Sequence, residues 1–404
     1  MEQANPDGTA CSIREPIHLY KTKIVSIKTI RGGKKMESSP MNIKRVISLC
    51  GACIAFYIGA GFATMQEVMQ YDVSYGSGFL IVVAVCALIY VYTNLSFTTN
   101  GSRMKLERGG DIYQVYAGKK IGAFYDIFAS FFSYMCFIVM CGGANATATQ
   151  QWGVPNGVGA IVLTITVVAT AVCGLNGILD ALGKIGPVII VLILSVSIYV
   201  CVTCFGSVPD NIARIDSGEF AGVIQQVGGG SAIVSGASYG GFVILWFATF
   251  LSEIGAKNKL KEANAGMLAS AAFIFLTTIL CSVALIAQID KTASAAIPAL
   301  VLTDSIHPML SQVFAVIIFC GIYTTAVPLL WTGISRLARE GSKKYKLLTV
   351  AGGILGCLVA CFLPYTWLVN ILYGLNGYLG AALVIFMIIH DVRTGMGKKN
   401  AAKK

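Results

Sequence analysis

The stretch Ile58-Gly59-Ala60-Gly61-Phe62-Ala63-Thr64 places two glycines near the middle of the chain's first apolar segment of membrane length. Lipid cannot satisfy the backbone N–H and C=O groups that an interruption frees, so irregular backbone in a bilayer lines a cavity or is buried in protein. Interrupted spanning helices are typical of the binding sites of secondary transporters. We therefore expect an interrupted first helix with a binding site beside it.

The composition is that of an integral membrane protein. Hydrophobic residues make up 56% of the chain and charged residues 12%, which is unlike a soluble domain. Apolar segments of about 20 residues, the length that crosses a bilayer core, recur ten times. They cover approximately 46–71, 77–98, 124–149, 157–175, 186–206, 234–256, 264–288, 309–337, 347–363 and 367–390.

The formal net charge of +11 comes from an uneven distribution of basic residues. If the N-terminus is cytoplasmic and all ten segments span the membrane, every Lys and Arg except Arg214 and Lys291 falls on the cytoplasmic side. This is the positive-inside rule. It predicts an all-α integral membrane protein with ten transmembrane helices and both termini cytoplasmic. The same distribution indicates that the partner of the basic residues is the lipid bilayer and not nucleic acid.

The longest stretch between two predicted spans, 207–233, divides the ten helices into two groups of five. We expect an extracellular loop here, between a first five-helix repeat at 41–206 and a second at 234–392. Because each group holds an odd number of spans, the second group enters the membrane in the opposite orientation, as in an inverted repeat. Phe62-Ala63-Thr64 recurs as Phe247-Ala248-Thr249, a match too short to carry this argument alone.

Both ends of the chain are polar and basic. Residues 1–40 show no apolar pattern, which predicts a disordered cytoplasmic tail and no cleavable signal peptide. Met36 and Met41, just before the first span, are alternative translation starts, and with either one the tail is an artefact of start-site choice. Residues 393–404 are expected to form a second basic cytoplasmic tail.

Two interpretations of the first segment are open at this stage. Unwinding at Gly59 and Gly61 would present backbone groups and half-helix dipoles to a substrate, whereas the same spacing also serves close helix packing. Glu67, about two turns further along, favours a site, because an ionisable residue inside a membrane is functional by default. Its alternative is a solvated position near the outer interface, together with Asp72.

The sixth predicted span repeats these features. Ser235-Gly236-Ala237-Ser238-Tyr239-Gly240-Gly241 interrupts its apolar run with glycines and hydroxyls, which indicates a second broken helix. The alternative is a glycine-rich loop, including Gly228-Gly229-Gly230, that ends before a short helix. Glu253 lies near the cytoplasmic end of this span, and we expect it to be solvated or paired with Lys257.

Adjacent hydroxyls in the eighth predicted span are candidates for a cation site. Thr324 and Thr325, with a backbone carbonyl near Gly321, offer oxygen ligands to a hard cation. Freed carbonyls around Ala55 and Ile58 would complete the shell. The alternative is that both threonine hydroxyls bond to carbonyls of their own helix, which is common in membranes.

Enzymatic chemistry finds no support in the sequence. The three histidines are His18, His307 and His390, and none has a partner at the spacing of a metal-ligand set or a catalytic triad. The sequence contains no glycine-rich phosphate-binding motif, so we expect no direct use of ATP. Its isolated polar residues form no ring of the kind that lines a channel filter. We expect no cofactor, and Na⁺ or H⁺ as coupling ion.

The segment from Gly59 to Glu67, Gly-Ala-Gly-Phe-Ala-Thr-Met-Gln-Glu, resembles the first-helix signature of the YkvI-like membrane proteins. In that family Gly usually stands at the position of Met65, which argues against a fully unwound turn there in this chain. Ile297-Pro-Ala-Leu, followed by a long helix with Ile322-Tyr-Thr-Thr-Ala-Val and Ser335-Arg336, is also similar to the family. The likeness covers about Met41 to Arg393.

The family is classed with amino-acid permeases of the amino acid–polyamine–organocation (APC) superfamily. The resemblance therefore implies a LeuT-type fold of five plus five helices with helices 1 and 6 broken, and a helix in the outer loop before span eight. It also implies sites residue by residue. The implied substrate-binding residues are Gly59, Ala60, Gly61, Phe62, Ser238, Tyr239, Gly240 and Gly241. The implied sodium ligands are Ala55, Ile58, Gly321, Thr324 and Thr325.

Together these features predict a secondary active transporter of a small, amino-acid-like solute. It would work by alternating access in the cell membrane as a symporter coupled to Na⁺ or H⁺, with Glu67 adding polarity or gating on the outer side of the substrate site. The alternative from another functional class is a membrane receptor subunit of the same fold that binds its ligand without transporting it. The sequence does not specify the substrate, the direction of transport or the oligomeric state.

Overall fold

The computed structural model describes residues 41–395 apart from 58–59, 107–108, 174–184 and 340. The predicted tails, 1–40 and most of 393–404, lie outside these residues. Throughout the described part the ordered backbone is helical, without any β-strand, apart from one isolated bridge between Ala221 and Ile224. The all-α prediction is confirmed for this part of the chain.

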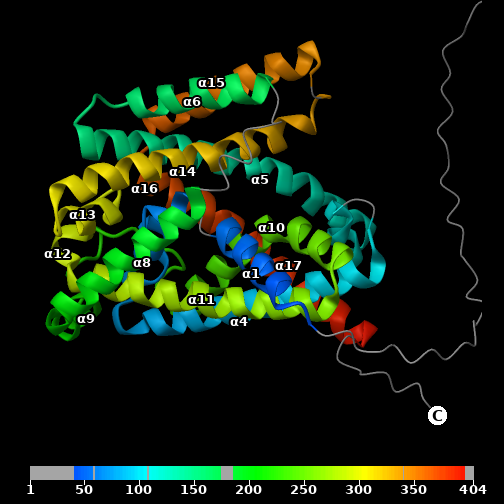
Figure 1. Cartoon of the computed structure of the whole chain (residues 1–404), viewed down its shortest axis with the longest axis horizontal. Coiled ribbons are helices and arrows are strands. Elements are labelled where there is room, and N and C mark those ends of the chain that lie inside the picture. The colour runs from blue at the N-terminus through cyan, green and yellow to red at the C-terminus, as the bar shows by residue number, and fades with distance from the viewer. Residues whose placement is uncertain (1–40, 58–59, 107–108, 174–184, 340, 396–404) are drawn as a thin grey trace, which may run out of the picture. The chain divides into compact units, whose positions relative to one another are not determined.

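The helices of the first predicted repeat follow one another in chain order (Figure 1). They are α1 (Ile43–Tyr57), α2 (Ala60–Ala63), α3 (Gln66–Tyr71), η1 (Val73–Gly78), α4 (Phe79–Met104), η2 (Gly109–Asp111), α5 (Ile112–Trp152), α6 (Val158–Cys173) and α8 (Ile185–Cys204). The short helix η3 (Phe205–Ser207) and α9 (Val208–Asp216) come next.

The second predicted repeat contains longer helices separated by short ones. They are α10 (Ala232–Lys257), α11 (Leu260–Ala287), α12 (Ile289–Thr292), α13 (Pro298–Asp304), α14 (Pro308–Ser335), α15 (Lys343–Phe362), α16 (Tyr365–Leu368), the π-helical turn η4 (Val369–Tyr373) and α17 (Gly374–Thr394). The helix that the family resemblance implies before span eight is present as α13.

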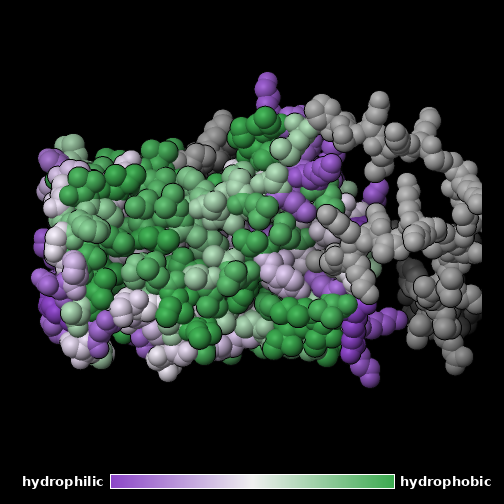
Figure 2. All heavy atoms as spheres, turned by 90° about the horizontal axis from the view of Figure 1, so that it is seen from below, coloured by the Kyte–Doolittle hydropathy of each residue, from purple (hydrophilic) through white to green (hydrophobic). Residues whose placement is uncertain are grey.

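Each of the ten predicted spans overlaps at least one helix in the described part of the chain. Seven helices in the described part are long and apolar enough to cross a membrane, and α10 adds an eighth if its two arms, bent by 56° between Leu245 and Phe247, form one span. The first segment is divided among α1, α2 and α3, and α6 is shorter. Figure 2 shows a broad hydrophobic band between hydrophilic ends on one face. The count of ten spans and the cytoplasmic termini stay predictions.

Two boundaries differ from the sequence expectation. Helix α5 begins at Ile112 rather than near 124, because a short helical segment precedes the apolar run and is joined to it by a kink at Gly118, where φ is 72° and ψ is 177°. The expected loop 207–233 contains the helix α9, which has Pro209 in its first turn and buries Val208, Asn211 and Ile215 along one side. Such a short amphipathic helix lacks the long apolar run by which the spans were recognised.

Small residues bring the long helices into close contact. Helix α10 packs along both α4 and α17, α14 packs along α5, and α1 packs along α11. A Cβ atom added to Gly380 of α17 would lie 1.8 Å from the carbonyl oxygen of Gly241 in α10. A Cβ atom added to Gly255 of α10 would lie 2.0 Å from the carbonyl oxygen of Thr98 in α4. These contacts place α10 at the centre of the bundle, as small interface residues do in membranes.

Candidate functional site

Residues 58–59, between α1 and α2, lie outside the described part, so the predicted interruption at Gly59 stays a prediction. The described part of the first segment is interrupted at Met65, which adopts φ 60° and ψ 8°. This left-handed conformation costs a residue with a Cβ atom about 1–2 kcal/mol. The expectation that Met65 argues against a turn at its position is therefore wrong.

Residues from distant parts of the chain satisfy the backbone at the interruption beside Met65. The Thr64 hydroxyl donates to the Gly61 carbonyl oxygen at 2.7 Å and lies 3.0 Å from the Tyr365 hydroxyl of α16. The Thr64 carbonyl oxygen accepts a hydrogen bond of 3.1 Å from the backbone N–H of Ala299 in α13. Buried backbone groups need such partners, so α13 and α16 hold the interruption in place.

Gly61 and Glu67 lie against each other across this turn. A Cβ atom added to Gly61 would lie 1.7 Å from Oε1 of Glu67, so only glycine leaves room for the carboxyl group. Glu67 is 6% exposed, and its Oε2 lies 3.4 Å from the donating hydroxyl of Tyr239. Asp72 is also buried. The alternative of a solvated Glu67 and Asp72 at the outer interface is therefore wrong.

A cavity opens beside this pair of residues. Residues from seven elements line it, most of them aromatic or aliphatic, and none of the lining residues is basic. The lining residues are Phe56, Tyr57, Gly61, Glu67, Met140, Phe242, Val243, Phe247, Thr325 and Tyr373.

The predicted break at Ser238–Gly241 is helical, and α10 bends further along, between Leu245 and Phe247. Gly240 and Gly241 serve packing instead: a Cβ atom on Gly240 would meet Ile89 of α4, and one on Gly241 would lie 2.1 Å from the Gly377 carbonyl oxygen of α17. The glycines and the bend therefore lie at different positions of α10, and the glycines have a packing role.

Two predicted residues of α10 have identifiable side-chain contacts. Tyr239 reaches Glu67, and the Ser238 hydroxyl donates to the Gly374 carbonyl oxygen at 3.4 Å. The bend itself brings Phe247 to the cavity, while Phe242 and Val243 line it from one turn earlier. Sequence reasoning missed these three as site residues, although Phe247 opens the Phe-Ala-Thr repeat of residues 62–64.

The two adjacent threonine hydroxyls of α14 bond to a carbonyl oxygen of their own helix, as the alternative interpretation expects. The hydroxyls of Thr324 and Thr325 both donate to the Gly321 carbonyl oxygen, at 2.7 and 3.1 Å. Each hydroxyl oxygen keeps lone pairs that can accept a cation. Thr325 also lines the cavity together with Gly61 and Glu67. Ala55 belongs to the last turn of α1, and Ile58 lies outside the described residues, so the sodium site stays a prediction.

Glu253 has the role expected of it. Its carboxylate forms a 2.8 Å ion pair with Lys257 one turn further along α10, and both side chains are exposed.

The segment that carries α12 and α13 is fastened over the interrupted helix. The side-chain amide of Gln150 in α5 forms two hydrogen bonds of 2.9 Å with Ile297, one to its backbone N–H and one to its carbonyl oxygen. Ala299 bonds to Thr64, as described above. Ile297, Ala299 and Leu300 are all buried. This segment therefore closes one side of the region that contains Glu67.

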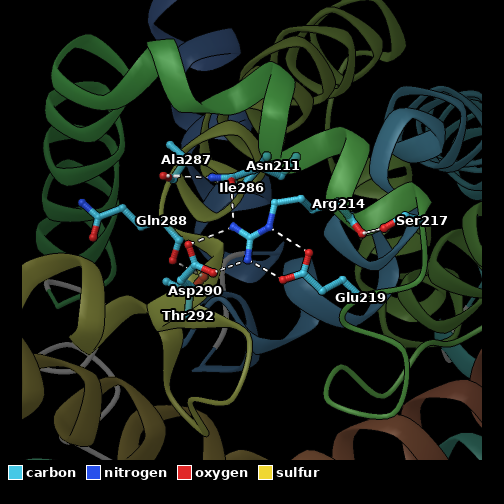
Figure 3. A network of polar contacts seen from close by, with 9 residues as sticks. All are labelled: Asn211, Arg214, Ser217, Glu219, Ile286, Ala287, Gln288, Asp290 and Thr292. Atoms are coloured by element: carbon cyan, nitrogen blue, oxygen red, sulfur yellow. Dashed lines mark hydrogen bonds and ion pairs between the residues drawn. The ribbon is translucent and has the colours of Figure 1, made fainter.

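A third fastening comes from α9 (Figure 3). The Arg214 guanidinium donates to Glu219 at 2.5 Å and to Asp290 of α12 at 2.6 Å. These hydrogen bonds hold the pKa of Glu219 and the pKa of Asp290 below the ordinary range of carboxyl groups. Asn211, one turn before Arg214, donates to the Ile286 carbonyl oxygen at the end of α11. Arg214, an exception to the cytoplasmic clustering of basic residues, thus joins α9 to α12.

Comparisons with known proteins identify the fold. No family model and no curated protein match the sequence. The crystal structure of MhsT in complex with L-phenylalanine is 16% identical in sequence, with a TM-score of 0.57 over 91% of each chain. A mutant of the Eremococcus coleocola manganese transporter is 15% identical, with a TM-score of 0.52 over 88% of this chain and 80% of its own. The chain is a multi-pass membrane protein with the LeuT-type fold of such transporters.

Proposed function

We propose that the protein is a secondary active transporter that moves a small amino-acid-like solute across the cell membrane by alternating access, in symport with Na⁺ or H⁺. The cavity beside the interrupted first segment carries this proposal. There Gly61 and Glu67 of the interruption meet Thr325 of α14 and the bend of α10. The fold supports it, since one similar structure is a manganese transporter and another holds L-phenylalanine.

The cavity lining favours a solute with an amine and an apolar body. Glu67 is the charged residue among the lining residues, and Tyr57, Phe242 and Tyr373 are among its aromatic neighbours in the lining. A carboxylate in a site of low polarity attracts an ammonium group and repels anions. Aromatic faces attract both cations and apolar groups. L-phenylalanine combines these features, and we propose L-amino acids with apolar side chains as the substrate class.

The carboxylate of such a solute needs hydrogen-bond donors. We propose that it binds backbone N–H groups at the interruption, among Gly59, Ala60, Gly61 and Phe62, where the positive end of a half-helix dipole adds to the attraction. Ser238, Tyr239, Gly240 and Gly241 are the proposed contributors from α10. Among them Tyr239 has the most direct support, because its hydroxyl already reaches Glu67.

For a sodium ion, the proposed ligands are the carbonyl oxygens of Ala55, Ile58 and Gly321 and the hydroxyls of Thr324 and Thr325. Support comes from the position of Thr325, which lies on the cavity wall opposite the interrupted helix. An ion bound there would hold α1 against α14 and complete the substrate site. Binding of ion and solute would then be coupled through the same two helices.

The test is uptake by the purified protein in proteoliposomes, with radiolabelled L-phenylalanine as probe and L-glutamate as the anionic comparison. We expect L-phenylalanine to accumulate and L-glutamate not to. Replacement of sodium by potassium, and Thr325→Ala, should each lower uptake about tenfold or more if sodium is the coupling ion. Thr166→Ala is the matched control, because it removes a hydroxyl that bonds within its own helix on an exposed face.

The outcomes separate the parts of the proposal. Uptake that needs no sodium and survives Thr325→Ala would remove the sodium site and leave a proton gradient as the driving force. Equal uptake of L-glutamate would contradict the role of Glu67 in selecting an amine. Binding of L-phenylalanine without uptake or exchange would overturn transport in favour of a receptor subunit.

A further inference from the structure

Asp72 is a fully buried acid without a side-chain partner. Its exposed fraction is 0%, and neither carboxyl oxygen has a hydrogen-bond partner among the described residues. It joins α3 to η1, a position at which aspartate often caps a helix, yet its side chain forms no cap. Its backbone is satisfied, because the N–H donates to the Val68 carbonyl oxygen and the C=O accepts from Tyr75. Only the carboxyl group of Asp72 therefore lacks hydrogen-bond partners.

The groups that surround Asp72 are acids and weak acids. Helices α2, α4, α9, α10, α11, α13 and the turn η4 pack against α3 or η1. Glu67 of α3, Cys86 of α4, Tyr239 of α10 and Cys281 of α11 lie within electrostatic range of Asp72. The other titratable groups on these surrounding elements near this end of the bundle are Tyr71, Tyr75, Asp210, Asp216, Asp304 and Tyr373.

The basic residues of these elements either lie far from Asp72 or are paired with other acids. Arg214 of α9 is held by Glu219 and Asp290. Arg103 of α4, Lys257 of α10 and Lys261 of α11 lie at the ends of their helices that are remote from Asp72. In the described part of the chain, the carboxyl group of Asp72 therefore has neither a hydrogen-bond donor nor a counter-charge.

A carboxylate in such surroundings is strongly destabilised, because burial removes its hydration and nothing replaces it. A bound proton removes the charge and needs only the carboxyl group itself. A metal cation such as Na⁺ or Ca²⁺ needs several converging oxygen ligands, whereas the titratable side chains of α4, α10 and α11 within electrostatic range of Asp72 are two thiols and a phenol. The surroundings thus favour a proton over a metal ion.

We propose that Asp72 is a proton-binding site and that the outer side of the protein closes only after this carboxyl group has been protonated. The inference rests on the proposed transport function. Helices α9 and α13 cover α3 and η1, and Ala299 of α13 bonds to Thr64. When these helices withdraw, outside water reaches Asp72, which ionises in water above about pH 4. Closure then takes one proton from that water onto a carboxylate oxygen.

This site links solute uptake to the outside pH. One proton enters the closed state with each closure and leaves to water when the carboxyl group is next hydrated. Glu67 lines the cavity and lies within electrostatic range of Asp72. A proton released toward the cavity can therefore pass by way of Glu67, which would make the cycle a proton symport.

The direct test is infrared spectroscopy of the purified protein in lipid, and it needs no substrate. At neutral pH we expect the C=O stretching band of a protonated carboxylic acid in the wild-type protein and its loss in Asp72→Asn. Asp210→Asn is the control, because it makes the same substitution at an exposed position of α9. A band of equal size in Asp72→Asn would overturn the proton site.

The second test is L-phenylalanine uptake as a function of outside pH. Wild-type uptake should fall as the pH rises, by up to about tenfold per pH unit for a single required proton. Asp72→Asn, which is neutral at every pH, should flatten this profile, and Asp210→Asn should keep it. A profile that is unchanged in Asp72→Asn would overturn the link to closure. If the wild type takes up nothing, the transport proposal fails, while the infrared band still decides the proton site.

Discussion

Asp72 and Asp391 are both buried aspartates that face α4, and their surroundings differ completely. Asp391 of α17 accepts hydrogen bonds from the side chains of Tyr92, Ser96 and Asn100, and it lies 3.1 Å from Nδ1 of His390. Asp72, beside the other half of α4, accepts none among the described residues. The two acids have nearly equal exposure, 0% and 7%.

The difference shows that burial alone does not tell what an acid in a membrane protein does. Several donors from α4 that converge on one carboxyl group join this helix to α17, which is a structural role. A carboxyl group without donors gains nothing from remaining charged and responds to any change in hydration. We therefore assign the Asp391 network to the stability of the bundle and the Asp72 region, with Glu67, to transport.

Asp391→Ala is expected to have the largest effect on stability. It removes the acceptor that Tyr92, Ser96 and Asn100 share, and each lost hydrogen bond costs about 0.5–1.5 kcal/mol. Thermal unfolding in detergent should show a loss of roughly 3 kcal/mol, and Asp391→Asn should lose less because it keeps an acceptor oxygen. If Asp391→Ala unfolds like the wild type, the structural half of the comparison is wrong.

Gly61→Ala is expected to have the largest effect on transport. The added methyl group would overlap Oε1 of Glu67 and displace the carboxyl group from the cavity. Uptake of L-phenylalanine should fall at least about tenfold, the effect of 1.4 kcal/mol at a binding site. Gly51→Ala is the control, since no atom lies within 4 Å of its added Cβ atom. Normal uptake by Gly61→Ala would show that Glu67 can move without consequence.

The sequence predicted the apolar segments and the importance of the first one, because both are local properties of composition and spacing. It also pointed to Glu67, through the rule that acids inside membranes are functional. It did not separate Asp72 from Asp391. Their difference depends on Tyr92, Ser96 and Asn100, which lie about 300 residues from Asp391 in the chain and come close to it only in the fold.

Glycine patterns were the weakest guide to where helices break. Gly240 and Gly241 look in sequence like Gly59 and Gly61, but they allow α10 to approach α4 and α17 without leaving the helix. In the described part of the first segment the backbone leaves the helical conformation at Met65, which is not a glycine. Packing of α13 and α16 against Thr64 imposes that turn, and such tertiary contacts override local preference.

Asp72→Asn should change stability in the opposite direction to Asp391→Ala at neutral and alkaline pH. The folded wild type holds a proton that the unfolded chain releases above about pH 4, so its stability falls as the pH rises. Asparagine carries no such proton, and the stability of the variant should not show this fall. Thermal unfolding at several pH values measures the difference. Parallel curves for the two proteins would indicate that Asp72 is ionised when folded.

Arg214→Gln tests a third kind of site, in which the acids Glu219 and Asp290 have a partner but are exposed. We expect the smallest change in stability here. Because hydrogen bonds from Arg214 lower the pKa of Glu219 and of Asp290, their stabilisation is present above the ordinary carboxyl pKa near 4 and is lost as the pH falls below it. The variant should unfold slightly earlier than the wild type at neutral pH, and the difference should vanish in acid. Exposed pairs are weak and screened by salt.

The control for this variant is Lys291→Gln, which removes the basic residue next to Asp290. If the charge of Arg214 matters only as part of the general field at this end of the bundle, both variants should shift unfolding equally. If its hydrogen bonds join α9 to α12, Arg214→Gln alone should do so, and it should also loosen the segment that covers Thr64. A larger effect in acid than at neutral pH would contradict the ion-pair explanation, because protonated carboxyl groups no longer attract the guanidinium.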